Sequence, residues 1–237
     1  MTPGLQLVVI AKAPVPGRVK TRLCPPYQPQ EAARLAAAAL ADVLDAVRAT
    51  PAARRVLVLD GDPDLVDYSG LDLLPQAPGT LDVRLAAAFH AVRGAPAFLV
   101  GMDTPQLTPR HLARAGAVLS RRDACLGPAL DGGWWGLGLR SPDPDLLLGV
   151  PCSLPTTGRA QHDRLVAAGL SVTLLPVLRD VDDADDAAVV AASYPATRFA
   201  RLQLALSCPR AAFESTSPER RPLGPLVLVR QVHGLAG

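Results

Sequence analysis

The sequence predicts an α/β protein in which helices cover both faces of one mostly parallel central sheet, giving three layers. Two observations lead to this fold class. Short apolar runs rich in β-branched residues alternate with longer helical patterns along most of the chain, which is typical of a parallel sheet with crossover helices. In addition, 49% of the 237 residues are apolar and only 19% are charged, which is enough apolar material for one substantial core.

The first half of the chain supplies the clearest elements. Residues 5–11 (LQLVVIA) form a short apolar run that suits a buried parallel strand. The Ala-rich segment 30–49 lies between Pro29 and Pro51, which predicts a helix, and a loop rich in proline and basic residues precedes it at 12–29. Further strands are expected at 55–59 and 71–74, followed by a helix at 81–92.

The second half continues the alternation. Residues 98–102 (FLVGM) predict a strand that ends at Asp103, and Thr108 with Pro109 predicts the start of a helix reaching about residue 120. The remaining expected elements are strands at 124–126 and 134–139, a helix at 158–168, a strand at 171–175 and a helix at 180–192. The sequence therefore predicts one domain over residues 1–194 and a C-terminal tail of unknown order over 195–237, where the pattern loosens.

Composition excludes several classes of function. The net charge is only +2 and aromatic residues are 4% of the chain, so nucleic acid is not an expected partner. The longest apolar stretch, residues 35–41, is far shorter than the roughly 20 residues that cross a bilayer, and no signal peptide is expected. The four cysteines are widely spaced, so we expect a reducing cytoplasm and neither a zinc site nor a disulfide. Nothing in the sequence specifies an oligomeric state.

The loop after the first strand carries four cations in eleven residues (KAPVPGRVKTR, residues 12–22), including the only two lysines of the chain. Ligands of open α/β sheets bind at the carboxyl ends of strands, and such a loop suits a di- or triphosphate. It is not a P-loop, because Val19 replaces the glycine before the Lys-Thr pair. The alternative is a solvated basic loop. The residues expected to bind phosphate are Lys12, Gly17, Arg18, Lys20, Thr21 and Arg22.

Asp103 follows the expected central strand in the stretch GMDTPQL, residues 101–107. A carboxylate in this place is costly to desolvate unless it meets a cation. Magnesium held through one or two carboxylates and the phosphates of a nucleotide fits the position, and manganese is the alternative. Asp103 could instead cap a turn, but Thr108 already caps the following helix.

The stretch GPALDGGWWGLGL, residues 127–139, contains a tight turn at Asp131, Gly132 and Gly133. Glycine allows the backbone to approach a substrate closely, although Asp-Gly is also a common hairpin turn. Alternation along a strand places one of the two tryptophans, Trp134 and Trp135, in the core. The other could line an acceptor site, and core packing of both is the alternative.

The acidic run 180–186 is interpreted first as the N-terminal cap of the last helix. A metal or substrate role for Asp180 or Asp182 is the second interpretation. The four histidines form no pair with metal-binding spacing, and no G-x-S-x-G, H-E-x-x-H or G-x-G-x-x-G motif is present.

Taken in order, the stretches AKAPVPGRVKTRL, GMDTPQLT, GPALDGGWWGLGL and LRDVDDADD resemble the DUF2064 family over about residues 5–193. Members of that family are labelled glycosyltransferases ("transferase 1, rSAM/selenodomain-associated") within the nucleotide-diphospho-sugar transferase superfamily. The chain is more distantly similar to guanylyltransferases of molybdenum cofactor and phospholactate. The resemblance implies a Rossmann-like GT-A fold, a nucleotide bound by the N-terminal half and Mg²⁺ held by aspartate.

The chain departs from the family pattern at two places. Around Gly79 the family usually has G-D-L-G, whereas this chain has Thr80 in place of the acid and Asp82 in place of the second glycine. The aromatic positions after the Asp-Gly-Gly turn are often tyrosine in the family and are both tryptophan here. If the first departure touches the nucleoside pocket, the base preference differs from that of relatives.

The expected function is a Mg²⁺-dependent transferase acting on a nucleotide or nucleotide-sugar donor and a small-molecule acceptor. Glycosyl transfer is favoured by the family label, and nucleotidyl transfer by the four-cation loop, since a triphosphate carries more charge. A nucleotide-binding protein without catalysis is the third alternative. The residues expected to act in catalysis are Asp103, Asp131 and Lys20, with Asp103 and Asp131 holding the metal and Gly132, Gly133 and Trp134 binding the acceptor.

Overall fold

A computed structural model of the chain describes residues 4–207, and within them it contains one seven-stranded sheet with the order β3-β2-β1-β4-β6-β5-β7. β6 is antiparallel to both of its neighbours, and every other pair of neighbouring strands is parallel. The strands are β1 (Gln6–Lys12), β2 (Arg54–Asp60), β3 (Asp72–Pro75), β4 (Ala97–Val100), β5 (Ala124–Pro128), β6 (Trp134–Leu139) and β7 (Val172–Leu174). The helices are α1 (Pro29–Ala49), α2 (Leu81–Ala91), α3 (Pro109–Leu119), α4 (Thr157–Ala167), α5 (Ala184–Ser193) and α6 (Arg198–Ser207).

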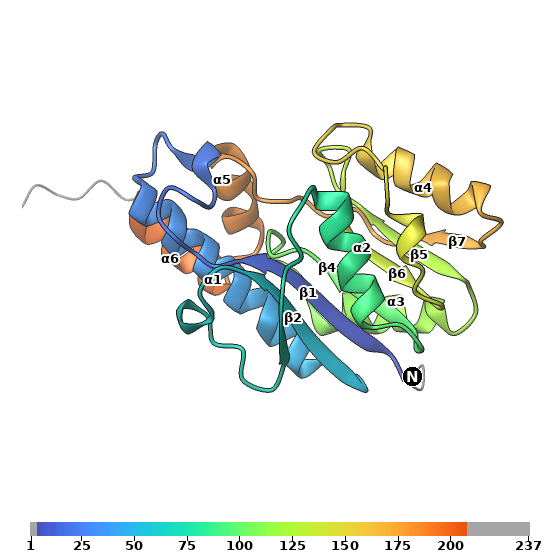
Figure 1. Cartoon of the computed structure of the whole chain (residues 1–237). Helices are drawn as coiled ribbons and strands as arrows, with labels where there is room; N and C mark the ends of the chain where they lie inside the picture. Colours follow the sequence, from blue (N-terminus) through green and yellow to red (C-terminus); the bar gives the residue numbers. More distant parts are fainter. Residues whose placement is uncertain (1–3, 208–237) are drawn as a thin grey trace, which may run out of the picture.

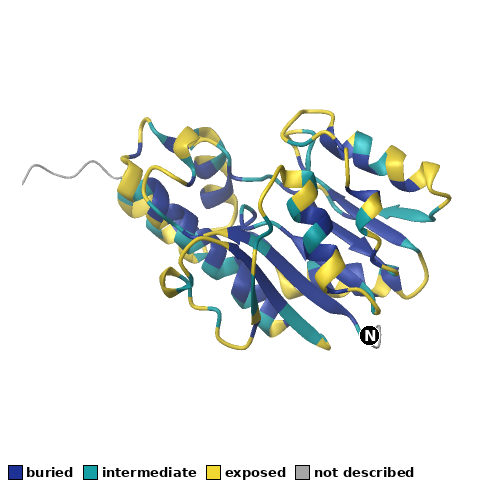
Figure 2. Ribbon diagram, in the orientation of Figure 1, coloured by how far each residue is buried: buried dark blue, intermediate teal, exposed yellow. Residues whose placement is uncertain are grey.

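Helices lie on both faces of this sheet (Figure 1), which confirms the predicted three-layer α/β fold with a mostly parallel sheet. Alternate side chains of β1 point to opposite faces: Val9 belongs to the hydrophobic cluster that includes α1 and α3, whereas Val8 belongs to the cluster that includes α2 and α4. Because both faces are covered, the central strands are buried along nearly their whole length (Figure 2). This explains why their sequences are continuous apolar runs rather than alternating patterns. No helix within residues 4–207 is long and apolar enough to span a membrane.

Local sequence signals place the helix starts. The hydroxyl of Thr108 accepts a hydrogen bond from the His111 backbone N–H, and Pro109 occupies the first helical position of α3, as predicted. α1 begins at Pro29, where the Gln28 backbone N–H donates to the Glu31 carboxylate at 2.9 Å. Both helices thus satisfy part of the free N–H groups of their first turn within the local sequence.

Two regions differ from the sequence-based expectation. The last expected helix, 180–192, begins only at Ala184, because the Asp183 side chain accepts from the Asp186 N–H and caps it there. Residues 180–182 therefore precede the helix rather than forming its first turn. In addition, part of the expected tail from 195 onward forms α6, which joins a hydrophobic cluster with α1 and α5 through Phe199. The rest of that tail, residues 208–237, lies outside the described residues.

The start of α6 is capped by a residue distant in sequence. Both carboxylate oxygens of Asp42, on α1, accept backbone N–H bonds, one from Arg198 at 3.1 Å and one from Phe199 at 2.9 Å. In the middle of α6, Gln203 Nε2 donates to the Tyr27 hydroxyl at 3.1 Å. These long-range contacts position α6, and a reading of local patterns along the chain does not reveal them.

Candidate functional site

The site lies where the chain changes direction across the sheet. From β1 the chain builds β2 and β3 on one side and then crosses to β4 on the other, so β1 and β4 are neighbours whose following loops diverge. In open α/β sheets such a switch point is where ligands bind, at the carboxyl ends of the strands. The basic loop follows β1, Asp103 follows β4, and the Lys12 backbone nitrogen lies 3.3 Å from the Met102 sulfur between them.

Lys20 joins the basic loop to the acidic side of the site. Its Nζ lies 2.7 Å from Asp103 Oδ1 and 3.4 Å from Asp182 Oδ1, and it also donates to the backbone oxygen of Val181. Burial by itself lowers the pKa of this ammonium, but the carboxylates of Asp103 and Asp182 outweigh that effect, so the pKa lies above its usual value. The Lys20 side chain, which is only 10% exposed, is therefore a charged group held in place by acids.

The backbone of Lys20 is in the left-handed region, with φ of 48°. This conformation costs a residue with a Cβ about 1–2 kcal/mol. Strain of this kind persists only where the surroundings fix it, and it is often found at functional positions. The buried side chain of Val19, just before it, anchors the loop in the core, so the strained turn directs Lys20 toward Asp103.

The segment 179–182 crosses the carboxyl edge of the sheet between β7 and α5 (Figure 1). Gln106 Nε2 donates to the Arg179 backbone oxygen at 2.6 Å, and the Val181 N–H donates to the Asp103 backbone oxygen at 2.9 Å. The segment is thus fastened to the loop after β4. This attachment brings the side chains of Asp180 and Asp182 to the site.

Asp180 is the most perturbed acid of the site. Burial, followed by repulsion from Asp103 and Asp131, raises the pKa of its carboxyl to about 7. Its Oδ1 is buried and has no hydrogen-bond partner among the described residues. A buried carboxyl oxygen without a hydrogen-bond partner is costly, which makes Asp180 a candidate for contact with a cation or a donor group of a ligand.

Asp131 lies at the turn between β5 and β6, on the exposed surface, and its Oδ1 accepts from the Gly133 N–H at 2.8 Å. Gly132 of this turn has a packing role. A Cβ on Gly132 would lie 1.9 Å from the Pro155 backbone oxygen, and Gly132 has φ of +87°. The Gly132 oxygen accepts the Gly158 N–H at 2.8 Å. Close contact with the start of α4 therefore requires glycine here, whatever substrate approaches.

The two tryptophans, Trp134 and Trp135, differ in burial as the alternation along the strand predicts. Trp135 is buried, donates from Nε1 to the Pro176 oxygen at 3.0 Å and meets Phe98 edge to face. Trp134 is partly exposed and packs against the cluster that includes α2 and α4. Trp135 is thus a core residue, and Trp134 is the one that solvent and a ligand can reach.

The structure brings together residues that the sequence singled out separately. Lys20 and Asp103 are in direct contact, and Asp131 is near enough to Asp180 to raise its pKa. Arg22 lies 3.3 Å from Asp182, whereas Lys12 forms no ion pair with a described residue. Gly17 has φ of +74° and nothing lies within 4 Å of the place a Cβ would take. The remaining predicted phosphate-binding residues, Lys12, Gly17, Arg18, Thr21 and Arg22, lie on the exposed side of the loop.

Three residues of the site, Asp180, Asp182 and Gln106, are missing from the set that the sequence predicts first. Helix capping is the first interpretation of the acidic run, and Asp183 does cap α5. A signal is nevertheless present, because 180–182 follow an expected strand as Asp103 does. Gln106 gives no signal of its own in the sequence, since its role depends on a contact 73 residues away.

The fit of a metal rests on the acids rather than on a preformed cage. Within residues 4–207 no three His, Cys, Asp or Glu side chains are gathered into a metal site. Mg²⁺ usually takes only one or two carboxylates from the protein and completes its shell with phosphate oxygens and water. Asp103, partly exposed, and Asp180, with its unpartnered oxygen, provide that kind of donor set.

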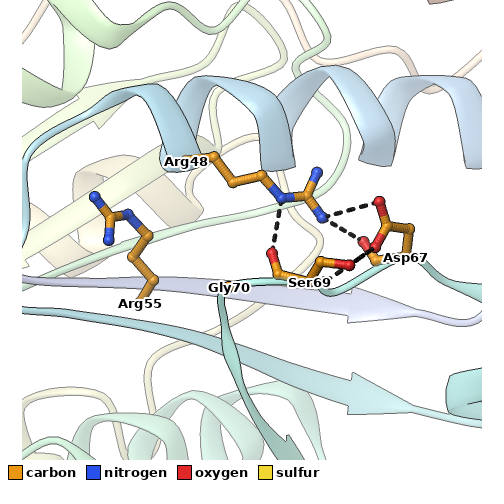
Figure 3. Close-up of a pocket in the computed structure, with 5 residues that line it drawn as sticks. All are labelled: Arg48, Arg55, Asp67, Ser69 and Gly70. Carbon is orange, nitrogen blue, oxygen red and sulfur yellow. Dashed lines mark hydrogen bonds and ion pairs between the residues drawn. The ribbon is translucent and has the colours of Figure 1, made fainter.

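A shallow depression of about 510 Å³ lies elsewhere, lined by Arg48, Arg55, Asp67, Ser69 and Gly70. Figure 3 shows the Arg48 guanidinium bound to Asp67 and Ser69, with Arg55 pointing away from this group. Arg55 donates instead to the backbone oxygens of Val47 and Thr50, at the end of α1. Both arginines are thus engaged in holding the end of α1 and its neighbouring loop, so this depression is structural.

Comparisons with known proteins agree with the fold. Residues 36–154 match the family described as "Uncharacterized protein conserved in bacteria (DUF2064)". No curated protein matches the chain in sequence. Among solved structures, a "putative nucleotide-diphospho-sugar transferase" from Desulfovibrio desulfuricans G20 is 25% identical, with a TM-score of 0.77 over 85% of this chain and 94% of that one.

Two further structures share the fold at lower identity. The CMP:2-keto-3-deoxy-manno-octonic acid synthetase complexed with CTP is 13% identical, with a TM-score of 0.56 over 81% of this chain and 99% of that one. The 2-C-methyl-D-erythritol 4-phosphate cytidylyltransferase of Thermus thermophilus is 16% identical, with a TM-score of 0.52 over 81% and 99%. At these identities the likeness concerns the fold alone.

Proposed function

The chain belongs to the DUF2064 family, and on that premise we propose that it is a nucleotide-dependent transferase that transfers a glycosyl group from a nucleotide-diphospho-sugar. The observation that carries the proposal is the contact of 2.7 Å between Lys20 of the basic loop and Asp103 after β4. In this proposal the contact joins the loop that would bind phosphate to the acid that would hold the metal, at the switch point of the sheet. The Desulfovibrio protein, with its description as a nucleotide-diphospho-sugar transferase, supports the donor class.

The donor's phosphates lie on the basic loop in this proposal. Lys12 and Arg18 are exposed and have no ion pair with a described residue, so they can take up phosphate oxygens without breaking a contact. The positive φ and open surroundings of Gly17 let the backbone come close to the phosphates. Charge-assisted contacts of this kind bind the leaving group and stabilise the charge it acquires.

Mg²⁺ or Mn²⁺ would be held by Asp103 and Asp180, with Asp131 beside them. When bound, such a cation neutralises the charge that develops on the leaving phosphate. Asp103 is positioned by the Val181 N–H on its backbone, and Asp180 by the Gln106 contact to Arg179. A sugar acceptor would approach beside Gly132, Gly133 and Trp134, next to the Asp131 carboxylate, which can orient its hydroxyl group.

Nucleotidyl transfer is the second candidate, and the density of cations in the loop favours it. Four cations within residues 12–22 match the charge of a triphosphate better than that of a diphosphate. The two reactions break different bonds. Glycosyl transfer breaks the anomeric carbon–oxygen bond and releases a nucleoside diphosphate, whereas nucleotidyl transfer breaks the bond between the α- and β-phosphates and releases pyrophosphate.

Product analysis separates the candidates. The protein is incubated with Mg²⁺ and a panel of nucleoside triphosphates and nucleotide-sugars, with a mixture of sugars and sugar phosphates as acceptors, and products are identified by mass spectrometry. We expect release of a nucleoside diphosphate from one nucleotide-sugar, with the Asp103→Asn protein as the inactive control. Release of pyrophosphate from a triphosphate would establish the second candidate. Nucleotide binding with no turnover of any donor would instead identify a non-catalytic nucleotide-binding protein.

A further inference from the structure

The ammonium of Lys20 is surrounded by the type of ligands that a divalent metal uses. Its three N–H groups face two carboxylates, Asp103 and Asp182, and the backbone oxygen of Val181. Hard divalent cations bind to the same combination of carboxylate and carbonyl oxygens. The side chain is almost fully buried, so it fills this oxygen-lined space rather than lying on its surface.

The acids of the site exceed the cations that face them. The carboxylates of Asp103, Asp131, Asp180 and Asp182 interact with one another or with Lys20, while Arg22 adds a second cation from the exposed side. When all four acids are ionised, two negative charges remain without a partner. Of the described residues, Lys20 is thus the one buried cation among these acids, and a divalent cation in its place would match their charge better.

We infer that Lys20 occupies the cation position of the ligand-free protein, and that the site therefore selects the metal–nucleotide complex over the free metal ion. The inference rests on the proposed function. A free metal ion that binds Asp103 must displace the ammonium from its 2.7 Å contact with that carboxylate, and leaves it, within residues 4–207, only the 3.4 Å contact with Asp182 and the Val181 oxygen. A metal ion that arrives with phosphates offers the ammonium new oxygen atoms to bind.

The length and flexibility of lysine suit this exchange. Four methylene groups allow the ammonium to turn from Asp103 to a phosphate above the loop, while the buried Val19 keeps the backbone in place. When metal and nucleotide are both bound, the metal takes the place of Lys20 at Asp103 and a phosphate binds the released ammonium. Metal therefore tightens the binding of nucleotide, and nucleotide tightens the binding of metal by the same factor. This coupling is the quantity that distinguishes the inference from simple metal binding.

The test measures binding of Mn²⁺ alone, from the electron paramagnetic resonance signal of the free ion, in the parent and three variants. Lys20→Met removes the competing charge and should bind Mn²⁺ roughly tenfold to a hundredfold more tightly. Lys20→Arg keeps a cation in place and should resemble the parent. Lys12→Met alters the other lysine of the same loop, which forms no ion pair with these acids, and should also leave the affinity for Mn²⁺ alone unchanged.

The same titrations are repeated with a nucleoside diphosphate, and thermal melting verifies that each variant is folded. In Lys20→Met, the factor by which the nucleotide increases the affinity for Mn²⁺ should fall toward one. If that variant does not fold, Lys20→Gln, which keeps hydrogen bonds to the acids without the charge, replaces it. If the neutral variant binds Mn²⁺ no more tightly than the parent, the inference is wrong. If nucleotide binding is still metal-dependent in that case, the proposed function stands. Absence of Mn²⁺ binding in every variant, with or without nucleotide, overturns both.

Discussion

Asp103→Asn is expected to abolish most of the Mg²⁺-dependent stabilisation that nucleotide gives the parent protein, and with it any transfer activity. The substitution keeps the shape of the side chain and removes its charge. Changing a residue that merely orients a metal ligand costs about 10–100-fold in affinity or activity, so loss of a direct ligand should cost roughly a hundredfold or more. Without metal, the variant should still fold, because Asp182 and the Val181 oxygen continue to bind Lys20.

Thermal melting with nucleotide, in the presence and absence of Mg²⁺, measures this effect. Ligand at about a hundredfold excess over its Kd should stabilise the parent by about 2.7 kcal/mol, and the Mg²⁺-dependent part of that shift should vanish in the variant. Asp185→Asn is the control for loss of one carboxylate, since this exposed acid of the run 180–186 forms no ion pair with Lys20. If Asp103→Asn keeps the full Mg²⁺-dependent shift of the parent, Asp103 does not hold the metal.

Asp180→Asn is expected to stabilise the metal-free protein at alkaline pH. The folded pKa of Asp180, about 7, lies above the ordinary value of 3.8. Stability from this raised pKa is fully present below about pH 4 and is lost as the pH rises through about 7, because the folded protein must then hold a buried carboxylate. Asparagine does not ionise, so the variant does not lose stability in this way. The advantage of the variant should grow by roughly 2–3 kcal/mol between about pH 5 and pH 8.

Urea unfolding in the presence of a chelator, at about pH 5 and pH 8, compares the two proteins. Saturating Mg²⁺ with nucleotide should reverse the order at the higher pH, because only the parent gains the metal at Asp180. The same variant should also lose metal-dependent nucleotide binding. Parallel pH dependence of the two stabilities would mean that Asp180 titrates normally and is not the constrained acid that the site requires.

The sequence contains enough information for the fold because its elements are specified locally. Buried parallel strands such as β1 are continuous apolar runs, and proline and threonine mark helix starts such as that of α3. The proximity of Lys20 and Asp103 could also be predicted from the sequence, since both residues follow strands that a parallel sheet places side by side. These inferences need only the period of the pattern and the rule that loops at one edge meet.

The features that could not be predicted from the sequence depend on contacts between segments that are distant along the chain. Asp180 and Asp183 belong to one acidic run, yet the first enters the site and the second caps a helix, a division made by the attachment of 179–182 to Gln106. α6 is held by Asp42 and Tyr27 of the first helix region. Gly132 resembles a substrate-binding glycine in sequence, whereas the approach of Pro155 already requires it.

The location of the metal tests the central claim most directly. A crystal of the protein grown with Mn²⁺ and a nucleoside diphosphate would reveal the ion by its anomalous scattering. We predict one peak within coordination distance of the Asp103 and Asp180 carboxylates and of the phosphates, with the Lys20 ammonium moved from Asp103 to a phosphate oxygen. A nucleotide bound with Lys20 still against Asp103, and Mn²⁺ elsewhere or absent, would contradict the account.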